Sequence, residues 1–221
     1  MWARAARGPE ASVTSTPYEP GRVGLLLIDT TNEVFHENGK GYPFYKAEFD
    51  RIGTFENLKR LLAGARELGI PVFFAPMSYT EEDYTTWKHP AGIHQVMFEN
   101  RMFQEGSWGA EFHADLSPVE GEIVIAPHKN IDVLATTDLD VQLRQHDVEY
   151  IAIAGMIGTM CVESTARSCM ERGYHVTIFT DATASDAGPE AYDAMIKRYP
   201  AISHATFDVD EFLGAVRAAG A

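Results

Sequence analysis

Three positions in this sequence carry a carboxylate, a cation and a thiol, which together could hydrolyse an acyl bond. Asp29 follows an apolar run, Lys129 stands beside His128 in IAPHKNID, and Cys161 opens CVESTARS. A thiol in the first turn of a helix lies near the positive end of the helix dipole, which lowers its pKa and favours the nucleophilic thiolate. Backbone N–H groups of the same turn could bind an oxyanion. These residue types therefore indicate acyl-transfer chemistry.

The elements that must position these residues follow from an alternation of apolar runs and helical patterns. Nearly apolar runs, typical of strands buried on both faces of a parallel sheet, cover 23–29, 71–77, 122–128, 150–156 and 175–184. Helical patterns cover 54–69, 137–147, 161–173, 189–199 and 208–220. The alternation predicts an α/β fold, a Rossmann-like doubly wound, mostly parallel sheet with helices on both faces. The three residues follow strands, so the carboxyl edge of the sheet would bring them together.

Two helix starts carry specific signals. Thr54 precedes a segment whose apolar residues share one face, and it is the expected N-cap there. Pro189 stands at a position that suits the first turn of a helix.

The length of 221 residues and 45% hydrophobic content suit one compact domain. We expect that domain to cover residues 20–221, after a flexible N-terminal arm at residues 1–19 that is rich in small residues and proline. Residues 78–121 are aromatic and lack a clear period, which predicts a long binding loop.

The formal net charge of −14 disfavours nucleic acid as a partner, because phosphate binding relies on clustered lysine and arginine. No apolar run is long enough for a membrane span, and the first residues lack the apolar centre of a signal peptide. We therefore expect a cytoplasmic protein that binds no membrane. Cys161 and Cys169 lie eight residues apart in one predicted helix, too far for a disulfide, so both are expected to be free thiols.

Each candidate also has a structural interpretation. An aspartate after a strand often caps the next element, a lysine there is usually solvated, and a cysteine in a first turn is often a small buried hydrophobe. From residue types alone, a hydrolytic site and a non-catalytic module both stay open. A nucleotide-binding site is disfavoured, because Gly155 and Gly158 do not form the G-x-G-x-x-G pattern.

The segments LLLIDTTNEVF and TTDLDVQLRQHDVEYIAIAGMIGTMCVESTARSCMERGYHVTIFTDATAS resemble the isochorismatase-like cysteine hydrolase superfamily over residues 20–215. The resemblance points to its amidohydrolase branch, with biuret, ureidoacrylate, N-carbamoylsarcosine and streptothricin hydrolases. It implies a catalytic triad of Asp29, Lys129 and Cys161. It also implies a cis peptide bond between Met156 and Ile157, and an oxyanion hole made by the N–H groups of Ile157 and Cys161.

The implied activity is cleavage of an amide, ureide or lactam C–N bond of a small molecule through a thioester, without a cofactor. The implied assembly is a homo-oligomer, a dimer or a tetramer. An isochorismatase that cleaves a vinyl ether without a nucleophilic thiol is an alternative, against which Cys161 argues. The acidity of the chain leaves a polyamine-bearing lactam open as a substrate.

The sequence departs from the family pattern at the lysine. Many relatives place it ten residues before the aspartate of T-D-L, a position that His128 occupies here, with Lys129 one step later. Lys129 is chosen because it is a permanent cation, and His128 is the alternative. The metal ligands of nicotinamidases have no counterpart after Asp29, so no metal is expected. Asn32 is expected to order the loop after Asp29, while Glu33 replaces the family's usual aspartate.

Segments that could line or cover the site supply the candidate substrate-binding residues. These are Phe35, Tyr79, Trp87, Trp108, His113 and His128.

Overall fold

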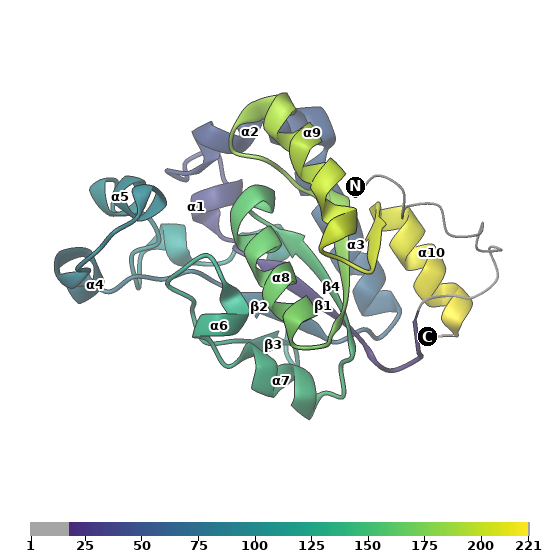
Figure 1. Cartoon of the computed structure of the whole chain (residues 1–221). Coiled ribbons are helices and arrows are strands. Elements are labelled where there is room, and N and C mark those ends of the chain that lie inside the picture. Colours follow the sequence, from purple (N-terminus) through teal and green to yellow (C-terminus); the bar gives the residue numbers. More distant parts are fainter. Residues whose placement is uncertain (1–17, 221) are drawn as a thin grey trace, which may run out of the picture.

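Between residues 18 and 220, which are the part of the chain that the computed structural model describes, six parallel strands form one sheet (Figure 1). Their order across the sheet is β3-β2-β1-β4-β5-β6. The strands are β1 (Val23–Ile28), β2 (Val72–Ala75), β3 (Ile123–Val124), β4 (Tyr150–Gly155), β5 (His175–Thr183) and β6 (Ala205–Phe207). The central strands β1, β2 and β4 are almost wholly buried, as the apolar runs predicted.

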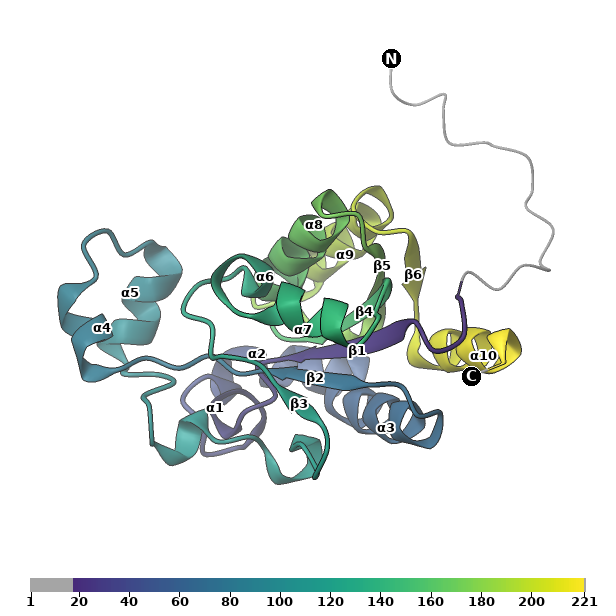
Figure 2. The ribbon, with the colours of Figure 1, turned by 90° about the horizontal axis from the view of Figure 1, so that it is seen from below.

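Helices cover both faces of this sheet, as Figure 2 shows. One face carries α6 (Val133–Thr136), α7 (Leu139–Gln145), α8 (Glu163–Glu171) and α9 (Gly188–Arg198). The opposite face carries α3 (Thr54–Glu67) and α10 (Val209–Ala219). The predicted doubly wound α/β fold is therefore confirmed.

Several elements were absent from the sequence prediction. They are α1 (Asn32–Phe35), α2 (Tyr42–Ile52), α4 (Glu81–Thr86), α5 (Gly92–Glu99), α6 and β6. The segment 78–121, which was expected to be an irregular loop, thus holds two helices, together with the short 3-10 turns η1 (Trp108–Ala110) and η2 (Ala114–Leu116). α4 and α5 lie apart from the sheet, at the left of Figure 1.

The predicted capping of α3 is wrong. Gly53, whose φ of 77° is left-handed, is the N-cap residue, and Thr54 already lies inside the helix. The buried Thr54 hydroxyl instead donates a hydrogen bond to the Thr183 carbonyl, 3.3 Å away, which ties α3 to β5. Pro189 does lie in the first turn of α9, as predicted.

Residues 1–17 of the predicted N-terminal arm lie outside the described residues. Tyr18, which was also assigned to the arm, is buried against Phe212, and its hydroxyl lies 2.8 Å from that of Thr177. Packing of the domain therefore already includes Tyr18, two residues before the predicted boundary. Within residues 18–220, no helix combines the length and the apolar composition of a membrane span.

The strand order also marks where a site can form. The chain runs outward from β1 through β2 to β3, then crosses back to β4 on the other side of β1. Beyond the carboxyl ends of β1 and β4, the connections diverge and leave a crevice. Asp29 follows β1 and the loop to Cys161 follows β4, so both residues lie at this crevice.

Candidate active site

Asp29 stands directly after β1, in a left-handed backbone conformation with a φ of 56°. Its N–H donates to the Ala75 carbonyl at 2.9 Å, so the residue is still attached to the end of β2. Aspartate tolerates this conformation better than most residues. The turn directs the chain into α1 and leaves the Asp29 carboxyl buried at the sheet edge.

His128 is the side chain that contacts Asp29. It lies in the segment after β3, where its N–H donates to the Pro76 carbonyl at 3.0 Å. The ring is fully buried, with Nε2 2.9 Å from Asp29 Oδ1 and Nδ1 2.7 Å from the Asn130 carbonyl oxygen.

These two contacts determine where the protons lie. The carbonyl of Asn130 can only accept, so Nδ1 of His128 carries a hydrogen. Nε2 then either donates to an ionised Asp29 or accepts from a protonated one. In both cases one proton lies in the hydrogen bond between Nε2 and Asp29 Oδ1. Burial lowers the pKa of His128, but the charge of Asp29 and its hydrogen bond outweigh burial and raise the pKa above its ordinary value. Both effects of Asp29 favour the protonated ring over the neutral one.

Lys129, the predicted triad cation, lies elsewhere. Its ammonium pairs with Asp83 near the start of α4, and its side chain is 40% exposed. Its backbone carbonyl accepts a hydrogen bond from the Tyr79 hydroxyl at 2.9 Å. The His128 ring contacts Asp29, whereas the Lys129 ammonium is engaged by Asp83. The geometry therefore places the alternative, His128, beside Asp29.

Cys161 lies in the first turns of a helical segment that starts earlier than predicted. The π-helical turn η3 (Gly158–Val162) precedes α8 and continues into it. The thiol is 5% exposed and borders a cavity. Burial raises the pKa of the Cys161 thiol well above its usual range, and Asp29 raises it further through its charge and a hydrogen bond. Burial and Asp29 thus oppose the lowering expected from the start of a helix.

The peptide bond between Met156 and Ile157 is cis, as predicted. The backbone N–H groups of Ile157 and of Cys161 both act on the Cys161 sulfur as hydrogen-bond donors, which partly offsets the rise in its pKa. Two donors thus converge beside the thiol, where an oxyanion would form.

A cavity of about 210 Å³ opens over the thiol. Asp29 and Cys161 border it together, with Met156, Ile157 and Met160 from the loop and turn after β4. Its other walls include Tyr45 of α2 and a set of apolar side chains from α5, namely Ile93, Val96 and Met97.

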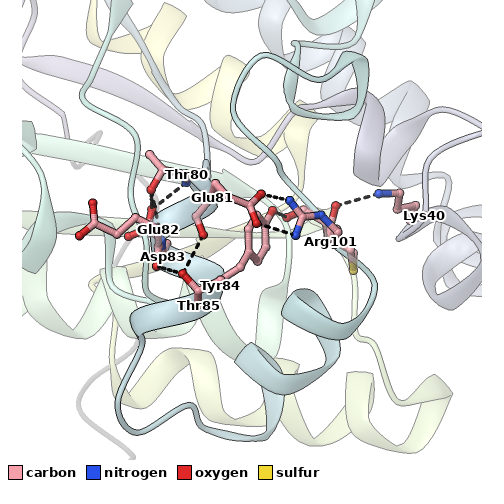
Figure 3. Close-up of polar contacts among 9 residues, drawn as sticks. Lys40, Thr80, Glu81, Glu82, Asp83, Tyr84, Thr85 and Arg101 are labelled. Carbon is pink, nitrogen blue, oxygen red and sulfur yellow. Dashed lines mark hydrogen bonds and ion pairs between the residues drawn. The ribbon is translucent and has the colours of Figure 1, made fainter.

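Polar contacts hold the α4–α5 segment to the body behind this wall (Figure 3). Arg101 pairs with Glu81, and its carbonyl accepts from the Lys40 ammonium at 2.7 Å. The Tyr84 hydroxyl donates to the Met102 carbonyl at 2.6 Å. The apolar wall is therefore fixed in place by ion pairs and hydrogen bonds on its outer side.

The predicted substrate-binding side chains do not border this cavity. Phe35 stacks on Phe49, and Trp87 packs against Tyr79 and His94. The Trp108 ring packs edge-on against that of His36, and the His113 ring packs edge-on against that of Phe55. His128 contacts Asp29 without bordering the cavity.

The wall of α5 had a signal in the sequence that was missed. Ile93, Val96 and Met97 have the i, i+3, i+4 spacing of one helix face, but the helix is only eight residues long. Tyr45 carried no comparable signal, since only the fold brings α2 to the crevice.

The residues after Asp29 stabilise their loop. The Asn32 amide donates to the Trp108 carbonyl at 3.0 Å, as expected of an ordering residue. Glu33 is buried and accepts from the N–H groups of Lys40 and Phe103. Within residues 18–220, histidine, cysteine and acidic side chains do not gather in a group that could hold a metal ion.

Comparison with known proteins agrees with this geometry. The family model described as the isochorismatase domain matches residues 23–208. The isochorismatase family protein YddQ of Bacillus subtilis is 30% identical over 73% of this chain and 77% of its own. The ureidoacrylate amidohydrolase RutB of Serratia proteamaculans is 25% identical, over 96% of this chain and 93% of its own length.

Solved structures share the fold. A cysteine hydrolase from Pseudomonas syringae pv. phaseolicola superposes with a TM-score of 0.77 at 20% identity, over 92% of this chain and 96% of its own. N-carbamoylsarcosine amidase of Thermoplasma acidophilum superposes with a TM-score of 0.66 at 21% identity, over 85% of this chain and 95% of its own. From the family match over most of its length, this chain belongs to the isochorismatase family of hydrolases.

Proposed function

We propose that this protein is a cysteine-dependent amidohydrolase that cleaves a C–N bond of a small molecule through a thioester. The observation that carries the proposal is the contiguous set His128, Asp29 and Cys161 at the cavity. Asp29 is hydrogen-bonded both to the buried histidine and to the Cys161 thiol. A base beside a nucleophile, oriented by a third group, is the arrangement that covalent catalysis requires.

In the first half-reaction, Asp29 takes the proton of Cys161 as the sulfur attacks the carbonyl carbon of the substrate. The His128 imidazolium stabilises the carboxylate before the transfer. The N–H groups of Ile157 and Cys161 bind the oxygen of the tetrahedral intermediate. As the intermediate collapses, Asp29 gives the proton to the leaving nitrogen, and the acyl group stays on the sulfur.

In the second half-reaction, water replaces the departed amine. Asp29 removes a proton from the water as it attacks the thioester carbonyl, and the same N–H groups bind the second oxyanion. Collapse breaks the carbon–sulfur bond, the proton returns to the thiolate, and the carboxylic or carbamic acid leaves. The side chains named, the backbone donors and water are sufficient for these steps.

The names of the relatives support a C–N bond as the target. RutB is an ureidoacrylate amidohydrolase, and a structural neighbour is an N-carbamoylsarcosine amidase. Both names describe hydrolysis of a small molecule at an amide-type bond.

Acyl-enzyme trapping tests this proposal. Wild type, Cys161→Ala and the control Cys169→Ala are mixed with a panel of amides and ureides, quenched in acid and weighed by mass spectrometry. Cys169 is buried and lies outside the cavity lining, so its variant should still release amine and acquire the acyl mass. Cys161→Ala should do neither. Turnover of an amide or ureide that survives in Cys161→Ala would contradict the thioester route.

A further inference from the structure

The cavity over Cys161 has an unusual chemical character for the site of a polar reaction. Of its sixteen lining residues, only Asp29, Tyr45, Cys161 and Asp186 bring polar side chains. Five of the others are methionines, namely Met77, Met97, Met102, Met156 and Met160. Among the described residues, no lysine, arginine or histidine lines the cavity.

This lining is unfavourable for an anionic substrate. A carboxylate taken from water into an apolar cavity loses its hydration, and a nearby cation must replace it if binding is to occur. The nearest candidates are engaged elsewhere: His128 binds Asp29 from behind, and Lys129 pairs with Asp83. The two aspartates that border the cavity would repel an anion further.

The same lining favours an uncharged apolar group. Burial of aliphatic or aromatic surface stabilises binding by about 25 cal/mol per Å². Methionine side chains are unbranched and polarizable, so they adapt to groups of irregular shape. Resting on the proposed amidohydrolase function, we propose that the substrate is an amide or ureide with an uncharged, apolar substituent that lies against the α5 wall of Ile93, Val96 and Met97.

Matched ligands test this directly. In Cys161→Ala, which cannot turn them over, calorimetry compares 5-methylhexanamide with glutaramate, in which a carboxylate replaces the isopropyl end. 5-Aminopentanamide carries an ammonium instead and tests attraction to Asp186. The proposal expects the uncharged amide to bind at least about tenfold more tightly than either ion, a difference of about 1.4 kcal/mol. Equal or tighter binding of glutaramate or of the amine would overturn it.

A pair of valines tests the role of the α5 wall. Val96 lines the cavity and is 41% exposed, so a lysine there keeps a path to water. Val141, 58% exposed on α7 and outside the lining, is the matched control. In the Cys161→Ala background, Val96→Lys should shift the preference toward glutaramate by about tenfold, and Val141→Lys should leave it unchanged. The same preference in both lysine variants would refute the assignment of this wall.

Turnover by the wild type separates this inference from the proposed function. Selective binding of 5-methylhexanamide without release of ammonia would contradict the amidohydrolase and leave the apolar pocket standing. Release of ammonia from glutaramate in preference to 5-methylhexanamide would support the amidohydrolase and contradict the apolar pocket.

Discussion

At the scale of single residues, the proposed triad has His128 where the family resemblance implied Lys129. A lysine stays charged over the whole physiological range, whereas a histidine can lose its charge within it. Here the Asn130 carbonyl and Asp29 hold both ring nitrogens of His128, and the pKa of the ring is raised. In the proposed site, the cation beside Asp29 is therefore sensitive to pH.

Replacement of His128 should reveal that sensitivity. The protonated ring is the active form, so kcat/KM of the wild type should fall as the pH rises through a pKa above about 6.5. His128→Gln removes the cation and should lower kcat by about 100-fold. His128→Lys restores a cation with a higher pKa and should move the alkaline fall upward. Measured pH profiles with the same alkaline limb in all three proteins would contradict this role.

At the scale of elements, Lys129 joins the loop after β3 to α4. The pair with Asp83 is partly exposed, so its contribution to stability is about 0–1 kcal/mol. Asp83 also accepts from the N–H and hydroxyl of Thr80, which caps α4. Lys129 therefore helps to hold the α4–α5 segment, which carries the α5 wall, and its ammonium pairs with Asp83 instead of Asp29.

Lys129→Met should accordingly change binding more than chemistry. We expect kcat to stay within about threefold of the wild type, while KM rises because the wall is less well supported. Asp83→Asn weakens the same ion pair and should behave alike. Steady-state kinetics with the amide substrate decide this, and a loss of kcat by about 100-fold in Lys129→Met would instead restore lysine to the triad.

Gly155 permits the close contact between β4 and β1 beneath the site. Its φ is 109°, and a Cβ atom there would lie 2.1 Å from the Ile28 carbonyl oxygen. Gly155→Ala should therefore lower the free energy of unfolding by about 3 kcal/mol or more. Gly214 in α10 has open space around it, so Gly214→Ala should raise the free energy by about 0.5–1 kcal/mol. Urea denaturation measures both, and equal effects would contradict the steric explanation.

At the scale of the whole molecule, the cavity is lined by residues that follow the strands and by residues of α2 and α5. Phe44 of α2, 56% exposed, and Val96 both border the cavity and also face solvent. The homo-oligomer implied by the family resemblance stays a prediction. A second subunit over these side chains would remove apolar surface from water.

Light scattering after size-exclusion chromatography tests that assembly. The chain has a mass of 24.5 kDa, so a dimer or tetramer should give two or four times this value at micromolar concentration. If the cavity rim lies in the interface, Phe44→Glu should lower the measured mass. A monomeric wild type would show the prediction to be wrong.

Most of the architecture could be predicted because it depends on local patterns. The buried runs that became β1, β2, β4 and β5 are apolar on both faces, and Cys161 follows one of them through a short loop. β6 was missed because Ala205–Phe207 is short and only partly buried. α5 was missed because eight residues show too few turns to establish a period.

The sequence by itself determined that Asp29 and Cys161 stand at one edge of a parallel sheet, since a residue that directly follows a buried strand has nowhere else to lie. Only the tertiary structure decided which of His128 and Lys129 lies beside Asp29, because their partners, Asp29 and Asp83, come from distant segments. It also decided the state of the thiol and the lining of the pocket. Both depend on burial, which arises when α2, α5 and the strand ends meet in space.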